Sequence, residues 1–254
     1  MHRDQPDPKL VEHLRAARRI LVFTGAGVST ASGIPDFRGP NGIWKRLRPV
    51  FFEDFLASEA ARIKYWDYKL ETWEAHAHAQ PNDVHHAIAR LERAEKVVAV
   101  VTQNIDGLHR RAGTSPDRLI ELHGTDHLVM CLQCQATSDP PAHLAQFKST
   151  RHPPRCPCGG LLKAATISFG QPLRATDLER AAGAAATADL VLALGSTLSV
   201  FPAASIPLLA AERGASYVIV NQGATGHDRH PRVTLRLDGD LTAIVPPAVD
   251  AALQ

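Results

Sequence analysis

Hydrophobic positions fall in short blocks along the chain, and polar or amphipathic stretches separate them. The apolar run at residues 20–23 has no polar interruption, which is typical of a strand buried on both faces. Leu10, Val11 and Leu14 lie at helical spacing, so we expect a helix over residues 8–19. The same patterns predict strands at residues 96–104, 118–124, 189–195 and 216–221, and helices at residues 51–93 with a break at Pro81, at about 175–187 and at 203–212.

This alternation of valine-rich runs and helices predicts an α/β fold: a Rossmann-like parallel sheet covered by helices on both faces. Each predicted strand ends in a polar or glycine-containing loop. The carboxyl ends of parallel strands meet at one edge of the sheet, where ligands bind, so we expect one composite site there. Residues 127–165 differ, because cysteines and prolines replace long apolar runs, and we interpret them as an inserted module.

Composition narrows the class of protein without identifying it. The chain has 254 residues, of which 44% are hydrophobic and 21% are charged, as in an ordinary folded protein. A net charge of +2 gives no reason to expect specific nucleic-acid binding. The sequence contains neither a signal-peptide pattern nor a run of roughly 18 apolar residues, so we expect a cytoplasmic protein without membrane contact. Composition says nothing about the oligomeric state.

The loop after the first strand is rich in glycine. Gly25 and Gly27 would allow a tight turn and a close approach of the backbone to a pyrophosphate, with the amides of a following helix facing the anion. A turn needed only for packing is the alternative. The next glycine is Gly33, so the G-x-G-x-x-G spacing of dehydrogenases fails. The adjacent residues 36–38 (Asp-Phe-Arg) supply an aromatic ring and a guanidinium, which can clamp another part of a nucleotide.

All four cysteines lie in the inserted module, as the pairs Cys131–Cys134 and Cys156–Cys158. Clustered thiols in a reducing compartment indicate a metal rather than disulfides. Four thiolates close a tetrahedral shell, so the expected ion is a structural Zn²⁺. The second pair is tighter than usual. His127, His143 or His152 could replace a cysteine, and unpaired buried thiols remain the alternative.

Several motifs in order resemble the sirtuin family, over roughly residues 8–245. These are GAGVSTASGIPDFRG (25–39), TQNIDGLH (102–109), ELHG (121–124), the four cysteines, SFG (168–170), LGSTLSVFP (194–202) and IVN (219–221). Details such as TIS before FG and HDRH (227–230) resemble the class IV branch. Two positions depart from many sirtuins: Gln171 stands where a glutamate is common, and Lys163-Ala164 replaces Arg-Pro.

The resemblance implies an NAD-dependent protein-lysine deacylase. In that reaction the oxygen of an acyl-lysine displaces nicotinamide from NAD and forms an imidate. The ribose 2′-hydroxyl then attacks the imidate, and water completes the acyl transfer, which yields free lysine, nicotinamide and O-acyl-ADP-ribose. His123 matches the general base of the family, and histidine is suited to taking a proton from a sugar hydroxyl near neutral pH. Asn104 is the second expected catalytic residue. The implied partners are acyl-lysine proteins.

Further site residues follow from the matched motifs. Asp106, with the backbone of Ile105, is expected to bind the nicotinamide carboxamide, and residues 37, 38 and 44 belong to a loop that closes over NAD. The expected NAD contacts are Gly25, Ala26, Gly27, Thr30, Asp36, Phe37, Arg38, Trp44, Gln103, Asn104, Ile105, Asp106, Gly195, Ser196, Asn221 and Leu241. The expected substrate groove comprises Ile167, Ser168, Phe169, Gly170, Val200 and Phe201.

The acyl chain is expected to enter an apolar tunnel. Sirtuins that favour acidic acyl groups carry a Tyr-x-x-Arg pair, which this chain lacks, so we expect acetyl or longer apolar groups rather than succinyl. Four side chains nearby could either line the pocket or pack a helix: Tyr65, Trp66, Tyr68 and Lys69.

The resemblance also implies a division of the chain. Residues 1–37, 94–126 and 164–254 are expected to form the NAD-binding domain, residues 38–93 a cofactor loop and helical module, and residues 127–163 the zinc module. Two other functions share the pocket: protein mono-ADP-ribosylation, and a non-catalytic NAD or ADP-ribose sensor. A sensor would have lost the base, yet His123 and Asn104 are both present.

Overall fold

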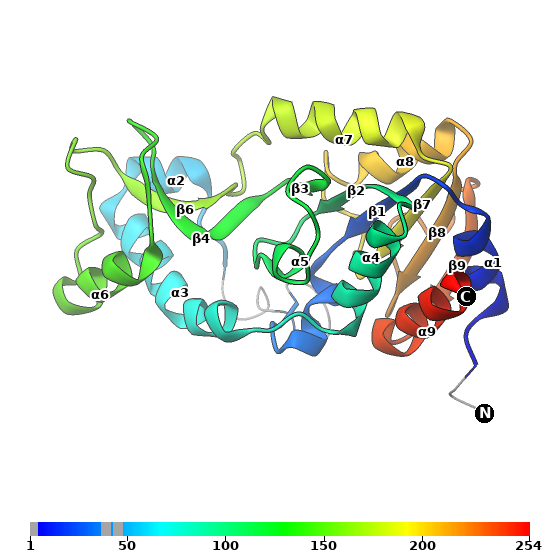
Figure 1. Cartoon of the computed structure of the whole chain (residues 1–254). Helices are drawn as coiled ribbons and strands as arrows, with labels where there is room; N and C mark the ends of the chain where they lie inside the picture. The colour runs from blue at the N-terminus through cyan, green and yellow to red at the C-terminus, as the bar shows by residue number, and fades with distance from the viewer. Residues whose placement is uncertain (1–4, 37–41, 43–47) are drawn as a thin grey trace.

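A computed structural model describes residues 5–36, 42 and 48–254. Its larger part is a six-stranded sheet in the order β3-β2-β1-β7-β8-β9, in which every neighbouring pair is parallel (Figure 1). The strand order reverses between β1 and β7, so a crevice opens there at the carboxyl ends of the strands. The strands are β1 (Ile20–Thr24), β2 (Val97–Thr102), β3 (Leu119–Glu121), β7 (Leu190–Leu194), β8 (Ser216–Asn221) and β9 (Val233–Asp238).

Helices cover both faces of this sheet, as the sequence predicts (Figure 1). One face carries α1 (Pro8–Ala16), α4 (Asp83–Arg93) and α9 (Leu241–Leu253). The other carries α7 (Ala175–Thr187) and α8 (Ser205–Glu212). The central strands β1 and β7 are buried along their whole length, which explains their continuous apolar sequences.

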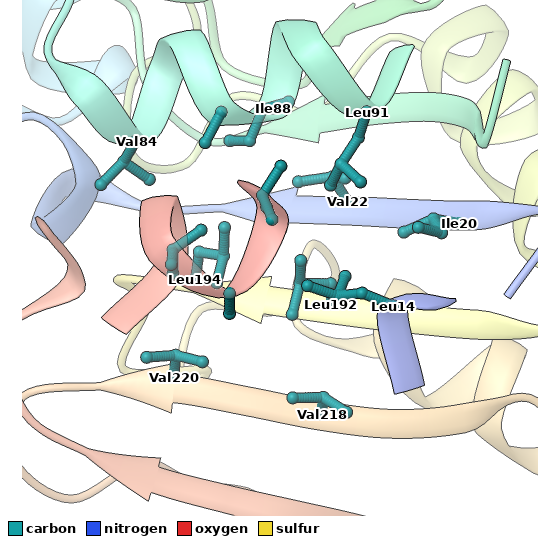
Figure 2. Close-up of a cluster of buried hydrophobic side chains, with 14 of the residues drawn as sticks. Leu14, Ile20, Val22, Val84, Ile88, Leu91, Leu192, Leu194, Val218 and Val220 are labelled. Atoms are coloured by element: carbon teal, nitrogen blue, oxygen red, sulfur yellow. The ribbon is translucent and has the colours of Figure 1, made fainter. Parts of the chain in front are cut away.

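The core under α1, α4 and α9 shows how this packing arises (Figure 2). Val22, Leu192 and Val218 project from neighbouring strands of the sheet toward this layer. Ile88 and Leu91 of α4 lie three residues apart, on the apolar face that meets them. All five side chains are fully buried, so this layer anchors the strands whose ends form the crevice.

A smaller part of the molecule surrounds a three-stranded antiparallel sheet in the order β5-β4-β6 (Figure 1). Its strands are β4 (Gly124–Cys131), β5 (Thr137–Ser138) and β6 (Leu162–Thr166). The helices α2 (Phe52–Ala57), α3 (Glu59–His78) and α6 (Pro140–Thr150) pack against it through a separate apolar core. Trp66 and Phe147 form the centre of that core, with ring centroids 6.2 Å apart.

Several elements differ from the sequence prediction. The strand pattern at residues 118–124 ends in the structure at Glu121, and β4 starts at Gly124. The helical stretch after Pro81 becomes α4 and packs on the large sheet, whereas the sequence analysis groups residues 83–93 with the helical module. The short α5 (Leu108–Arg111), β9 and α9 are not predicted. Two prolines inside α9, Pro246 and Pro247, explain why its pattern does not indicate a helix.

Among the residues that the structure describes, we find no helix combining the length and the apolar character that crossing a membrane requires.

Candidate active site

A cavity of about 1300 Å³ lies at the carboxyl ends of β1, β2, β7 and β8, where the strand order reverses. Loops after these strands form one wall, and α3 together with the segment after β6 forms the other. The cavity therefore lies between the large sheet and the smaller part of the molecule. This confirms the prediction that the polar strand ends meet in one composite site.

The glycine loop forms two 3₁₀ turns, Ala26–Val28 and Thr30–Ser32, in place of the expected α-helix. A Cβ at Gly25 would lie 2.8 Å from the carbonyl oxygen of Gly195, and a Cβ at Gly27 would lie 2.8 Å from its Cα. Gly195 itself has φ +60°, which favours glycine. The glycines are thus needed to interlock the loops after β1 and β7, and both loops line the cavity.

A buried hydrogen-bond chain fixes Asn104 at the cavity wall. Its Nδ2 donates to the carbonyl oxygen of Gly25 at 3.1 Å and to Ser29 Oγ at 3.1 Å. The hydroxyl of Ser29 in turn donates to Asp106 Oδ2 at 2.6 Å, and Leu108 N donates to Asp106 Oδ1 at 2.9 Å. The amide oxygen of Asn104 is therefore held in one orientation, because both described contacts of the side chain use its nitrogen.

His123 lies between β3 and β4, at the cavity, with its ring oriented by the backbone. Its Nδ1 is 2.9 Å from the carbonyl oxygen of Gln103. A carbonyl can only accept, so Nδ1 carries the hydrogen and the lone pair of the neutral ring lies on Nε2. Gln103 also donates through Nε2 to Ser196 Oγ at 2.9 Å, which ties the β2 and β7 loops together. The tautomer is the one that a general base needs.

The structure brings most of the predicted residues to this cavity. The expected NAD contacts that line the cavity, at what we call its nucleotide end, are Gly25, Ala26, Gly27, Thr30, Asp36, Gln103, Asn104, Ile105, Gly195, Ser196, Asn221 and Leu241. The groove contains Ile167, Ser168, Phe169, Gly170, Val200 and Phe201. Among the described residues expected to contact NAD or the peptide, only Asp106 does not line the cavity, and it contacts Asn104 through Ser29. Phe37, Arg38 and Trp44 lie outside the described residues.

The sequence leaves open whether Tyr65, Trp66, Tyr68 and Lys69 of α3 line the pocket or pack the helix, and the structure shows both. Tyr65, Tyr68 and Lys69 line the cavity, whereas Trp66 is fully buried in the core of the smaller part. Lys69 Nζ pairs with Asp126 Oδ1 at 2.5 Å, and His76 Nδ1 lies 2.9 Å from Asp126 Oδ2.

Lys69 and Asp126 shift each other's pKa. Burial opposes the charge of Lys69, but the carboxylate of Asp126 outweighs burial and raises the pKa of the lysine. Burial likewise opposes the charge of Asp126, but Lys69 and His76 hold the pKa of this carboxyl well below its usual range. Lys69 is therefore a charged residue at the cavity wall whose charge is already compensated.

The four cysteines gather at the far end of the smaller part. Their Sγ atoms all lie within 4.8 Å of one another, with Cys131 and Cys158 at 3.6 Å and Cys134 and Cys156 at 3.7 Å. A Zn²⁺ ion with four thiolates at about 2.3 Å has sulfur–sulfur edges of roughly 3.8 Å, so the cluster fits this ion. No histidine belongs to the cluster within the described part of the chain. A complete thiolate shell makes the metal structural.

Two features were missed or misplaced by sequence reasoning. The role of Ser29 is not predicted. The signal that could have indicated it is the position of a serine in a glycine loop beside the end of a strand, where its hydroxyl can be buried. His227 lies in a polar stretch that does not indicate burial, yet it is buried, and its Nδ1 lies 2.8 Å from the Tyr217 hydroxyl. The loop folds back over β8, a tertiary contact that no local pattern indicates.

Comparisons with known proteins agree with this geometry. The Sir2 family model matches residues 25–202. The chain is 41% identical over 230 residues to NAD-dependent protein deacetylase 1 of Bradyrhizobium diazoefficiens, covering 91% of each chain. It is also 41% identical over 245 residues to an NAD-dependent protein deacetylase of Haloarcula marismortui, covering 95% of this chain and 92% of the relative.

Solved structures give the same answer. A Sir2 variant with deacetylated p53 peptide and 3'-O-acetyl ADP ribose superimposes with a TM-score of 0.87 at 35% identity, over 98% of both chains. A complex of Sir2 with p53 peptide and NAD⁺ gives a TM-score of 0.83 at 33% identity, over 92% of this chain and 93% of that one. The resemblance drawn from the motifs is confirmed, and the chain belongs to the Sir2 family.

Proposed function

We infer that the chain is an NAD-dependent protein-lysine deacetylase or deacylase. The observation that carries this conclusion is the pairing of His123 and Asn104 in one cavity. His123 has its Nδ1–H fixed on the Gln103 carbonyl, and Asn104 is fixed by Gly25 and Ser29. The family relatives are named NAD-dependent protein deacetylases, in agreement with this geometry.

Each residue then has a task in the reaction. Bound NAD supplies a sugar carbon at which the oxygen of an acyl-lysine displaces nicotinamide. The Nε2 of His123 accepts the proton of a sugar hydroxyl, because its Nδ1 is committed to donating. The fixed amide oxygen of Asn104 orients a hydroxyl or a water beside it. The loops after β1, β7 and β8 bind the rest of the dinucleotide.

The acyl-lysine peptide lies, in this proposal, between residues 167–170 and residues 200–201. Both segments line the same cavity as His123. The amide of Ile167 donates to the carbonyl oxygen of His123 at 2.8 Å, so the groove and the base are joined through the backbone. An extended peptide added here would use backbone hydrogen bonds for affinity and side-chain pockets for specificity.

The side chains of α3 that line the cavity also affect which acyl group fits the pocket. Lys64 and Lys69 are the lysines of α3 that line the cavity, and Asp126 neutralises Lys69 at 2.5 Å. A carboxylate on the acyl chain would have to compete with that buried ion pair. Acetyl or longer apolar groups therefore fit this pocket better than succinyl. Rates on acetyl, myristoyl and succinyl peptides test this ranking, and a fastest succinyl reaction would overturn it.

The function is tested by nicotinamide release from NAD, with and without an acetyl-lysine peptide. We expect release to depend on the peptide and to fall by at least roughly a hundredfold in His123→Ala. His152→Ala is the matched control, because its side chain is 80% exposed. Release without peptide, with ADP-ribose transferred to protein, would instead establish ADP-ribosylation. Confirmed NAD binding without any release would establish a sensor.

A further inference from the structure

The segment that follows β8, residues 221–228, borders the nucleotide end of the cavity. Asn221, Gln222 and Gly223 line it directly. This segment contains no helix or strand beyond Asn221, so its backbone is not held by a regular hydrogen-bond ladder. Its shape therefore depends on individual hydrogen bonds, many of which are made by side chains.

Arg236 of β9 binds the backbone of this segment but does not line the cavity. Its Nη1 donates to the carbonyl oxygen of Asn221 at 3.0 Å and also contacts that of Leu237. Its Nη2 donates to the carbonyl oxygen of Gly223 at 2.5 Å. A planar guanidinium can bond several acceptors at once from a fixed fork, which an ammonium cannot do.

The third side of the guanidinium binds Asp228. Arg236 Nε donates to Asp228 Oδ1 at 2.8 Å, and the two side chains are only 19% and 28% exposed. The same carboxylate accepts from the hydroxyl and the amide of Thr225, at 2.6 Å and 3.0 Å. These bonds hold the pKa of Asp228 below its usual value against the opposing effect of burial. This charged pair thus contacts the turn at Asn221, Gly223, Thr225 and Asp228.

This turn also supports the loop after β7. The amide of Gly226 donates to the carbonyl oxygen of Thr197 at 2.8 Å. A Cβ at Gly226 would lie 2.6 Å from the carbonyl oxygen of Leu198, so the two loops are in close contact. The supported loop carries Ser196 at the nucleotide end and Phe201 in the groove.

We propose that Arg236, acting with Asp228, is a positioning residue for NAD binding. It fixes the loop after β8 in the shape that receives the adenosine half of the dinucleotide, and through Gly226 it supports the loop after β7. This inference rests on the proposed function for the identity of the ligand. It assigns a role to β9, whose residues touch neither the base nor the groove.

The first test compares Arg236→Met with Arg232→Met, which removes an exposed arginine of the same region. ADP-ribose binding is measured by calorimetry, and nicotinamide release gives kcat and the KM for NAD. We expect Arg236→Met to raise the Kd for ADP-ribose and the KM for NAD by roughly tenfold, since charged hydrogen bonds are lost. The value of kcat should change by less than about twofold, because His123 and Asn104 are untouched.

A second set of variants separates positioning from folding. Arg236→Lys keeps the charge but loses the fork, so its KM for NAD should lie between those of wild type and Arg236→Met. Asp228→Asn should raise the KM in the same direction. The double variant Arg236→Met/Asp228→Asn should be no worse than the stronger single variant, because both changes break one unit. These milder variants keep the test open if Arg236→Met does not fold.

Different outcomes reject different statements. If wild type does not bind ADP-ribose, the proposed function fails. If wild type binds it but Arg236→Met binds it equally well, the inference fails and the proposed function stands. Equal losses in Arg232→Met would overturn the inference in favour of a general charge effect. A fall in kcat at unchanged KM, or additive effects in the double variant, would also overturn it.

Discussion

The Nδ1 atom of His123 is held by the backbone, and this contact decides which proton chemistry the ring can perform. Because the Gln103 carbonyl accepts from Nδ1, Nε2 is the basic atom. The base is thus oriented by the backbone of the loop after β2. Asn104 is prepared in the same way, by the Gly25 carbonyl and Ser29.

Ser29 is the residue on which this preparation depends. Its hydroxyl accepts from Asn104 and donates to Asp106, and it is fully buried. In Ser29→Ala the amide of Asn104 loses one partner and the carboxylate of Asp106 loses another. We expect kcat/KM for peptide-dependent nicotinamide release to fall by roughly a hundredfold, as small misplacements of catalytic groups do.

The control for that change is Ser149→Ala, which removes an exposed hydroxyl bonded to the Gln146 carbonyl in α6. It should leave kcat/KM unchanged. Thermal unfolding of both variants shows whether Ser29→Ala is folded. A folded Ser29→Ala protein with wild-type activity would contradict the assigned role of the Ser29 hydroxyl.

At the level of elements, α3 is joined to β4 by a buried charge cluster. Lys69 and His76 of α3 both contact Asp126 of β4, and all three side chains are almost completely buried. Removing one partner of such a pair leaves an uncompensated buried charge. We expect Asp126→Asn to lower the free energy of unfolding by about 3–5 kcal/mol at pH 7, measured by chemical denaturation.

The exposed pair Arg90–Asp250 provides the matched control, at 2.9 Å with side chains 32% and 56% exposed. Asp250→Asn should cost at most about 1 kcal/mol, because exposed ion pairs contribute little. Adding Lys69→Met to Asp126→Asn should recover part of the loss, since the unpaired ammonium is removed. If Asp126→Asn and Asp250→Asn cost the same, the buried cluster is not a source of stability.

The zinc module has its own prediction, because its core is small and its metal shell is complete. Removal of Zn²⁺ by a chelator should unfold β5 and α6 before the large sheet, since metal binding supplies much of the folding free energy of such modules. The ring centroids of Trp66 and of Phe147 in α6 lie 6.2 Å apart, so a change in tryptophan emission reports the unfolding of α6. We expect one zinc ion per chain in wild type and loss of that ion in Cys134→Ser. Unchanged emission after complete zinc removal would contradict a structural role.

At the scale of the whole molecule, the parallel sheet explains why much of the site follows from the sequence. Gly25, Asn104, Gly195 and Asn221 each lie at or just beyond the end of a strand with a clear apolar pattern. Once those strands are parallel neighbours, their ends must meet at one edge. The apolar patterns do not reveal the order of the strands in the sheet. In a parallel sheet, however, the loops that follow the strands all lie at the same edge whatever that order is.

What could not be predicted consists of contacts made by loops after the chain has folded. Arg236 lies in β9, whose alternation is weak because most of its residues are only partly buried. The bond from Ser29 to Asp106 joins residues 77 positions apart, and its length depends on two irregular turns. The polar sequence around His227 does not indicate that this residue is buried against Tyr217. Local patterns carry no information on such distances.

The whole fold should also respond to acid through two buried histidines. His85 and His109 have ring centroids 4.9 Å apart beneath the site. Burial, together with the neighbouring His109 and His86, lowers the pKa of His85 from 6.5 to about 2. Burial also lowers the pKa of His109 to about 4, against the opposing effect of the Asp106 carboxylate. His109 Nε2 is 2.9 Å from Thr24 Oγ1, whose own hydrogen goes to Thr102, so His109 donates from Nε2 as a neutral ring.

The sign of the pH effect follows from these depressed pKa values. Below about pH 6.5 the unfolded chain binds protons that the folded chain refuses, so the free energy of unfolding falls as the pH falls. Each histidine contributes a slope of up to about 1.4 kcal/mol per pH unit between pH 6.5 and 5. In His109→Asn the unfolded chain binds about one proton fewer, so the fall of the unfolding free energy per pH unit should be smaller. His86→Asn changes an exposed side chain and should keep the wild-type slope. Chemical denaturation at pH 7, 6 and 5 measures it; a slope unaffected by His109→Asn would show that His109 takes up its proton in the folded state as readily as in the unfolded chain.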